Sequence, residues 1–162
     1  MAVEYFLKID GIAGESVDAK HKNEIEVQSF NWGEQSTISG SPGGGGGGAG
    51  KVVPSEFRYA AQTSKASPAL MLACATGELI KQATLVARRS GKSQLEYLTM
   101  TFSDVRVALY EINSTPPNEV GPTDQVSLNF ATLRMTYKVQ KADGSAGQSI
   151  VGAFDFKANK KI

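Results

Sequence analysis

The sequence predicts a mainly β protein, a barrel or a sandwich of about eight mostly antiparallel strands with one short helix. Apolar and polar residues alternate with a period of two through most of the chain, and a single segment has the spacing and end signals of a helix. At 162 residues, the chain is expected to form one domain, residues 1–162.

The first two strands follow this alternation. Residues 3–10 alternate between an apolar face and a mixed one, as in a strand with one buried side. In the second strand, Val27 and Phe30 are large and apolar but of opposite parity. A β-bulge near Gln28 or Ser29, which lets a strand change faces, is therefore expected.

The later strands are marked in the same way. The sequence SGKS at 90–93 is typical of a hairpin connection, and the parity of the long segment 125–139 changes between Phe130 and Leu133, which predicts one bent strand. The expected strands contain Phe57 and Tyr59, ATLVARR (83–89), QLEYLTMTF (94–102), VRVALYEI (105–112), the segment 125–139, and Phe154 with Phe156.

A helix is predicted over residues 67–77. Ser67 can cap its start, Pro68 suits the first helical position because no N–H is needed there, and Gly77 can adopt the left-handed conformation that ends a helix.

The predicted helix has apolar residues four positions apart. Leu70 pairs with Cys74 and Met71 with Ala75, so both pairs are expected to pack against the strands. Free cysteine is among the most buried residue types, and Cys74 is interpreted as a packing residue rather than a nucleophile.

Composition excludes several classes of protein. With a net charge of +1 and few clustered basic residues, nucleic acid is not an expected partner. Apolar runs fall short of the roughly 20 residues that span a bilayer, so membrane insertion is not expected either. The first residues do not resemble a secretory signal, and a single cysteine suits a reducing cytoplasm, so any export requires dedicated machinery.

The glycine-rich segment 36–51 could be a phosphate-binding loop, because it ends in Gly50 and Lys51. However, Val52 stands where a P-loop has Ser or Thr, and Val53 and Pro54 do not favour the helix that a P-loop requires. The segment is therefore predicted to be an extended loop, and an NTPase is a weak alternative.

Catalytic and metal-binding patterns are poor. His21, the single histidine, lies in a charged loop near Ser16 and Asp18 without the rigid geometry that a triad needs, and it is expected to be solvated. One His and one distant Cys do not supply a zinc site. No enzymatic activity, cofactor or metal is expected.

The polar sides of several strands carry few charges. Surfaces that meet other proteins are depleted of charge, although Thr also simply favours strands. Together with long connections at 10–24, 36–51 and 113–124, these neutral faces suggest self-association. The faces comprise Ser29 and Asn31; Thr99, Thr101 and Ser103; and Gln125, Ser127, Asn129 and Ala131.

Five segments in order resemble the Hcp (haemolysin-coregulated protein) family, which forms the tube of the bacterial type VI secretion system. They are MAVEYFLKIDGIAGES (1–16), EIEV (24–27) followed by FNWG (30–33), GGAGK (47–51), SPALMLACATGE (67–78) and QVSLNFATLRMTYKVQKADG (125–144). The resemblance covers nearly the whole chain, but the family often has a Trp near Phe154, so the closing strand departs from it most.

The resemblance implies a two-sheet antiparallel β-barrel with one flanking helix, assembled into a hexameric ring with an open centre. Rings would stack into a tube that a contractile sheath expels with a trimeric spike protein at its tip. It also implies that small effector toxins travel inside the ring, and that the protein starts in the bacterial cytoplasm and is secreted without a signal peptide.

The resemblance also implies roles for particular residues. Asn31, between the two aromatic residues of FNWG, would face the central opening and contact cargo together with Ser29. The glycine loop would contact neighbouring subunits or stacked rings through Gly43, Gly44, Gly45, Gly46, Gly47, Gly48 and Lys51. The alternative is a monomeric β-barrel that binds a small ligand or peptide in its mouth.

Overall fold

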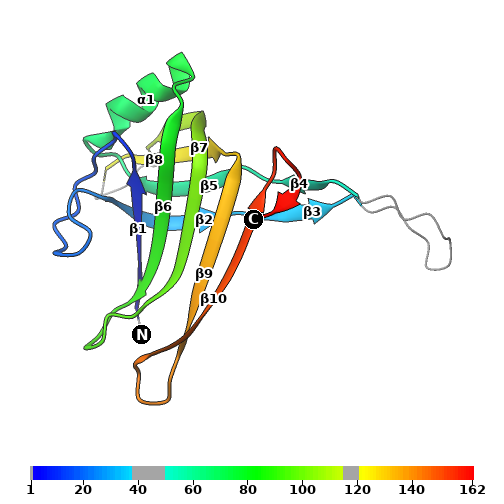
Figure 1. The fold of residues 1–162 in the computed structure, drawn as a ribbon. Helices are drawn as coiled ribbons and strands as arrows, with labels where there is room; N and C mark the ends of the chain where they lie inside the picture. The colour runs from blue at the N-terminus through cyan, green and yellow to red at the C-terminus, as the bar shows by residue number, and fades with distance from the viewer. Residues whose placement is uncertain (1, 38–49, 115–120) are drawn as a thin grey trace.

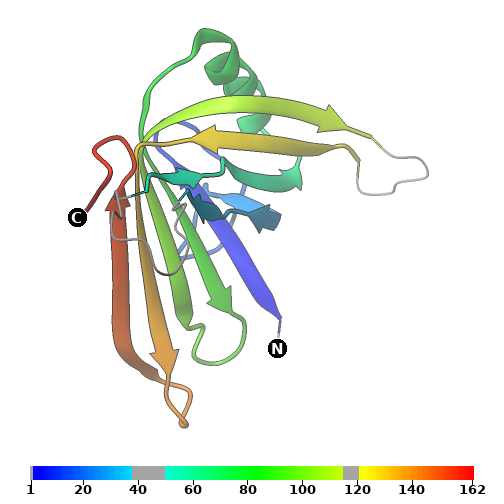
Figure 2. The ribbon, with the colours of Figure 1, turned by 90° about the vertical axis from the view of Figure 1, so that its right-hand side faces the viewer.

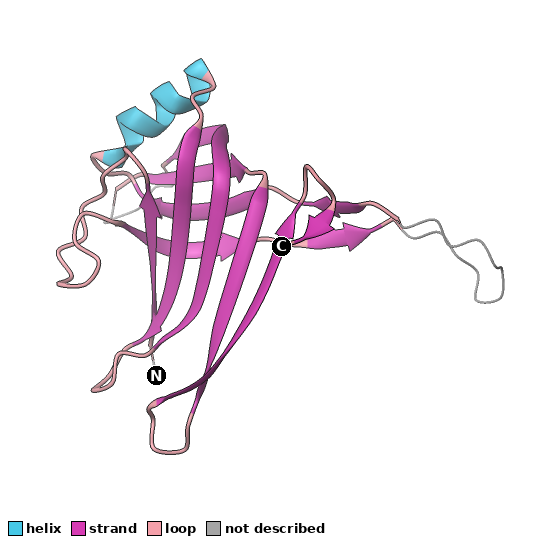
Figure 3. Cartoon of the chain, viewed as in Figure 1, coloured by secondary structure: helices cyan, strands magenta, loops and turns pink. Residues whose placement is uncertain are grey.

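The computed structural model describes residues 2–37, 50–114 and 121–162. In this part of the chain there are eleven strands and one helix (Figure 3). They are β1 (Val3–Ile9), β2 (Ile25–Asn31), β3 (Glu34–Ser36), β4 (Val52–Pro54), β5 (Phe57–Gln62), α1 (Ala66–Thr76), β6 (Ile80–Arg89), β7 (Glu96–Asn113), β8 (Thr123–Asn129), β9 (Thr132–Gln140), β10 (Ala146–Asp155) and β11 (Lys160–Lys161).

The strands form a closed antiparallel barrel with an extension. Nine strands pair in the order β11-β10-β9-β7-β6-β1-β2-β5-β8, and β7 also pairs with β8, which closes a barrel of β7, β6, β1, β2, β5 and β8. In Figure 1, β1, β6, β7 and β9 form one layer, and β2, β5 and β8 cross behind it. The expected barrel with one flanking helix is confirmed.

Strand β7 differs from the prediction because it is a single strand where two were expected. Its first half pairs with β6 and β9, and its second half pairs with β8 (Figure 2). Asp104, with φ of 54°, lies where the partners change. A residue in this left-handed region lets the strand turn from one layer into the other without ending.

Segment 125–139 also differs from the prediction, because it forms two strands where one was expected. It was expected to be one bent strand, but it forms β8 and β9, separated at Phe130 and Ala131. The predicted change of parity lies at this break, where the chain leaves one layer and enters the other. The Ala131 N–H bonds to the Ser103 carbonyl at 2.9 Å, which fixes the corner against β7.

The predicted bulge in β2 is present. Val27 pairs with Ala61 and Ser29 with Ala60, so Gln28 is the additional residue. After this bulge, Phe30 packs against the core and Asn31 is exposed.

Large side chains fill the barrel interior. Leu7, Phe57, Leu85, Phe102 and Leu128 are fully buried, and the Phe57 and Phe102 ring centroids are 4.7 Å apart. Burying a side chain of this size stabilises the fold by about 1.5–3 kcal/mol. These described side chains occupy the interior of the barrel.

Helix α1 begins one residue earlier than expected. Lys65 occupies the N-cap position without a side-chain hydrogen bond, so Ser67 is not the cap and Pro68 is the third helical residue. The Ser67 hydroxyl instead donates to the buried Asp124 carboxylate and so ties the helix to β8. Gly77 ends the helix in the left-handed conformation, as predicted.

The buried face of α1 also differs in part. Leu70 and Ala73 are buried and Cys74 packs against the core, whereas Met71 is half-exposed. Residues 66, 70 and 73 form the face of the helix that is buried against the barrel. The predicted pair of Met71 and Ala75 therefore lies on the exposed face.

Two extensions leave the barrel. The short strands β3 and β4 form a ladder that projects away from it (Figure 1). The second extension, here called the wing, consists of β9, β10 and β11, paired onto the first half of β7. The Phe130 ring, 4.7 Å from Phe102 and 5.8 Å from Phe156, connects the wing to the core. Phe154 lies in β10 as expected, and Phe156 directly follows it.

Candidate functional site: the exposed sheet faces

Ser29 and Asn31 lie on the outer face of the barrel layer formed by β2, β5 and β8. Their cross-strand partners are Ala60 and Arg58, and both Ser29 and Asn31 are exposed. A shallow hollow of about 430 Å³ opens here, lined also by Gln125. The structure therefore brings together two of the residues that the sequence singled out, on one largely neutral face.

A second face, rich in threonine, lies on β6, β7 and β9, and its charged member Arg134 is the β9 partner of Thr101. Thr99 pairs with Thr136 of β9, and Thr101 pairs with Thr84 of β6. Thr99 and Thr101 are half-buried. This face belongs to the other layer of the barrel, so the charge-poor strand faces found in the sequence are two separate surfaces.

The wing presents apolar side chains that nothing in the described residues covers. Tyr137 and Ile150 are directly paired, with 41% and 55% of their surfaces exposed, and Val139 on the same face of β9 is 41% exposed. This face continues outward from buried Leu133 and from Phe102 of the core.

The glycine-rich loop is anchored by the β3–β4 ladder. Thr37 donates its N–H and its hydroxyl to the Lys51 carbonyl, and Ser36 pairs with Val52. Lys51 is exposed and leads into a strand, not into the helix that a phosphate-binding loop requires. Positions 43–48, for which subunit contacts were predicted, lie outside the described residues.

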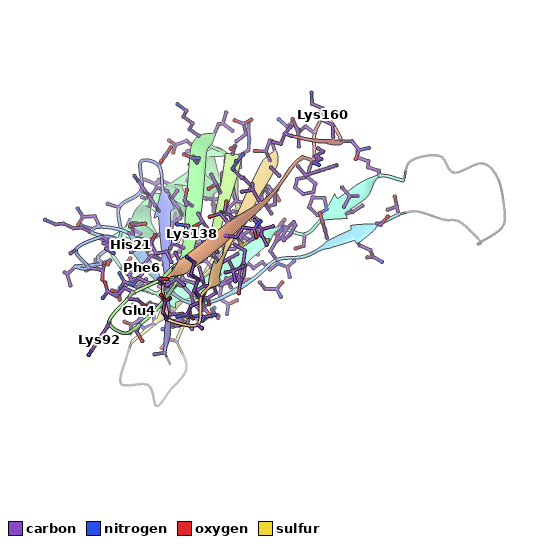
Figure 4. All side chains as sticks on the ribbon, turned by 60° about the horizontal axis from the view of Figure 1, so that its bottom comes forward. Glu4, Phe6, His21, Lys92, Lys138 and Lys160 are labelled. Carbon is purple, nitrogen blue, oxygen red and sulfur yellow. The ribbon has the colours of Figure 1, made fainter. Side chains whose placement is uncertain are left out.

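His21 is buried, which contradicts the expectation of a solvated histidine. Its Nδ1 lies 2.7 Å from Glu24 and its Nε2 2.7 Å from Glu96, while its ring stacks on Phe6 with centroids 4.3 Å apart. Figure 4 shows His21, Phe6 and Glu4 side by side. A protonated imidazole donates to both carboxylates, whereas a neutral one donates to one.

Arg88 holds the same loop onto the barrel. Its guanidinium donates to Glu4 of β1 and to both carboxylate oxygens of Asp18 at 2.7–3.1 Å. These hydrogen bonds keep the pKa of Asp18 far below its usual range. The side chain of Phe6, which lies 4.8 Å from the guanidinium, is consequently buried although it belongs to the mixed face of β1.

This cluster was missed in the sequence because its members come from distant segments. The only local signal was the separation of His21 and Glu24 by three residues. Since Glu4, Arg88 and Glu96 lie on neighbouring strands, the cluster required knowledge of strand order. The ion pairs and hydrogen bonds of this cluster hold loop 10–24 against the barrel.

Within the described ranges, no group of three or more His, Cys, Asp or Glu side chains is arranged to hold a metal ion. The same residues include no helix that is long and apolar enough to cross a membrane.

These features define a class of protein. A packed barrel, outer faces rich in neutral polar residues on both of its layers, a wing whose apolar face the described residues leave exposed, and a projecting ladder are features of a building block whose surfaces meet other proteins. A sequence profile described as "Type VI secretion system effector, Hcp" matches residues 6–137. The chain belongs to the Hcp family and is a structural subunit of the type VI secretion tube.

Individual relatives agree with this assignment. Protein hcp1 of Pseudomonas aeruginosa is 41% identical over 146 residues, which is 90% of this chain and 89% of that protein. The crystal structure of Hcp1 from Salmonella typhimurium is 41% identical, with a TM-score of 0.84 and full coverage of both chains. A further structure, described as a type six secretion system protein, has a TM-score of 0.93 at 26% identity and covers 99% of this chain and 100% of its own.

Proposed function

We propose that six copies of this chain close into a ring with an open centre, and that the rings stack into the secretion tube. The support is family membership together with the composition of the surface. A head-to-tail ring uses two different patches of each subunit, and the rotation between copies closes the assembly. The neutral and apolar faces described above offer such patches.

The observation that carries the proposal is the uncovered apolar face of the wing. Tyr137, Val139 and Ile150 continue the core outward into solvent. Contiguous exposed apolar surface in a folded protein marks an interaction site. A neighbouring copy that packs on the wing would bury this surface and complete the core at its edge.

The test is the native mass of the protein and of two variants. Ile150→Lys places a charge on the apolar face and is expected to shift the chain from hexamer to monomer. Leu72→Lys is the matched control, because Leu72 is 57% exposed on helix α1 and lies outside the wing and the neutral faces. An Ile150→Lys variant that stays hexameric would contradict the use of this face.

The glycine-rich loop is proposed to contact neighbouring subunits or stacked rings. Glycine tolerates positive φ and permits close approach of two backbones, while ordering costs roughly 1 kcal/mol or more per residue. Deletion of residues 43–48 should leave the ring intact and weaken stacking, as judged by size-exclusion chromatography and electron microscopy. Tubes of unchanged length and number would rule out this role.

Asn31 and Ser29 are proposed to face the lumen and contact cargo. The support is their exposure on a neutral face with an open hollow. An Asn31→Gln variant should assemble normally and lose binding of at least one effector. Normal binding of every effector by assembled Asn31→Gln rings would exclude the cargo role.

The remaining partners are proposed from family membership. They are a trimeric spike protein at the tip of the tube, the contractile sheath around it and small effector toxins inside it. In this proposal the protein has no enzymatic activity and leaves the bacterial cytoplasm through the secretion apparatus. A monomeric β-barrel that binds a small ligand or peptide in its mouth is not favoured, because the chain belongs to the Hcp family.

A further inference from the structure

The hollow on the β2, β5 and β8 face contains an arginine among neutral polar groups. Arg58 lies on β5, the middle strand of this face, with Ser29 and Asn31 from β2 on one side and Gln125 from β8 on the other. If this face lines the lumen, as proposed above, the hollow is accessible to cargo.

The strand register places these groups within reach of one ligand. Asn31 is the direct partner of Arg58, which is in turn the partner of Ser127. Directly paired residues on a sheet have Cβ atoms about 4.5–5.5 Å apart. The next residue along β5 on this face is Ala60, opposite Ser29, and its small side chain leaves the space beside the guanidinium open.

Arg58, like Arg134 on β9, differs from the three arginines that have partners in the described residues. Arg88 is held by two carboxylates, Arg89 donates to an amide oxygen, and Arg106 donates to the carbonyl of Gly77 at 3.1 Å. Arg58, by contrast, has no hydrogen bond or ion pair within the part of the chain that the structure describes. It is exposed and retains its donors for a ligand.

The neighbouring polar groups are similarly available. Across the described residues, the side chains of Ser29, Asn31 and Gln125 have no hydrogen-bond partner. The carboxylates of this face, Glu26 and Glu111, form no ion pair with the guanidinium either. The hollow therefore combines one cation with several neutral donors and no bound counter-charge.

We propose that this hollow binds a carboxylate of the cargo protein, from an Asp or Glu side chain or from the C-terminus of the chain. A guanidinium binds a carboxylate through two parallel N–H···O bonds, which are stronger than bonds between neutral groups. The Asn31 amide and the Ser29 hydroxyl would donate to the same oxygens. Arg58 thus selects for acidic cargo segments.

Fluorescence anisotropy of labelled peptides with the full-length protein tests the proposal. An oligoglutamate peptide with an amidated end and an oligoglutamine peptide with a free carboxylate represent the two sources, and amidated oligoglutamine is the neutral control. At least one carboxylate peptide should bind, and the one that binds identifies the source. Equal binding of all three peptides, or of none, would overturn the proposal.

Two variants locate the binding. Arg58→Gln should weaken carboxylate binding about tenfold or more. Arg134→Gln is the matched control, because Arg134 is an exposed strand arginine on β9 outside the hollow. Equal loss in both variants would indicate general charge attraction and contradict the site.

Native mass separates this inference from the proposed function. Arg58→Gln should form the same hexamer as the unaltered protein. A hexamer that binds carboxylate peptides independently of Arg58 would refute the carboxylate site alone. A chain that never forms a ring would instead refute the proposed assembly, whatever the peptides do.

Discussion

Arg88 shows how a single side chain fixes a long loop. It is 2% exposed, and its carboxylate partners come from β1 and from loop 10–24. Glu4 and Asp18 remain partly in contact with water, with side chains 43% and 23% exposed. The guanidinium therefore keeps its charge at a buried position because two partners supply hydrogen bonds there.

Replacing Arg88 by Met should lower the free energy of unfolding by about 2–3 kcal/mol. This is below the 3–5 kcal/mol typical of fully buried pairs, since the stranded carboxylates reach solvent. Urea unfolding measures the change, with Arg89→Met as a neighbouring control. If Arg88→Met lowered the free energy of unfolding no more than the control does, the stabilising role of Arg88 would be contradicted.

The same contact predicts a dependence of stability on pH. Hydrogen bonds from Arg88 lower the pKa of Asp18 in the folded state. A carboxylate with a lowered folded-state pKa stabilises the fold above its unfolded pKa of about 3.9, and the contribution is lost as the pH falls through the folded value. The urea midpoint should fall below pH 4 more steeply for the unaltered protein than for Asp18→Asn. Parallel curves would contradict this assignment.

At the scale of elements, loop 10–24 depends on a close approach of its two arms. The Gly14 N–H donates to the Asn23 carbonyl at 2.8 Å, and the Ser16 N–H donates to the Glu24 carbonyl at 3.0 Å. A Cβ atom on Gly14 would lie 2.4 Å from the Glu24 carbonyl oxygen. The loop is therefore a packed, hydrogen-bonded structure, and glycine is required at this position.

Gly14→Ala should consequently destabilise the protein by about 1–3 kcal/mol, because the two arms must separate. Gly33→Ala is the matched control, since an added Cβ there meets nothing within 4 Å. Thermal unfolding compares the two variants. Similar melting temperatures for both would show that the loop can relax at no cost.

Elements were predictable from sequence where the pattern is local. The alternation in β1, the bulge after Val27 and the end of α1 at Gly77 depend on neighbouring residues, and each was confirmed. Strand continuity was not predictable, because the passage of β7 through Asp104 depends on which strands lie beside it. The ladder of β3 and β4 has three residues a side, too few for periodicity to be visible.

The candidate site was likewise predictable only where the sequence pattern is local. The neutral strand faces were visible in the sequence, since parity together with the expected bulge near Gln28 or Ser29 assigns Ser29 and Asn31 to the outside. The position of Arg58 beside Asn31 and Ser127 was not visible, because it follows from the pairing of β2, β5 and β8. The burial of His21 was likewise hidden, because Glu96 lies 75 residues away in the chain.

At the scale of the whole molecule, the barrel and the wing differ in how their apolar side chains are covered. The barrel interior is filled by fully buried side chains, whereas the apolar face of the wing extends beyond the core. The two neutral faces lie on different layers of the barrel. The proposed assembly would thus use surfaces that remain exposed in the folded subunit.

The native mass of the purified protein tests this proposal most directly. Mass spectrometry under non-denaturing conditions, or light scattering after size exclusion, should give a hexamer for the unaltered chain and a folded monomer for Ile150→Lys. A stable monomer of the unaltered protein at high concentration, with the wing exposed to solvent, would contradict the proposed ring.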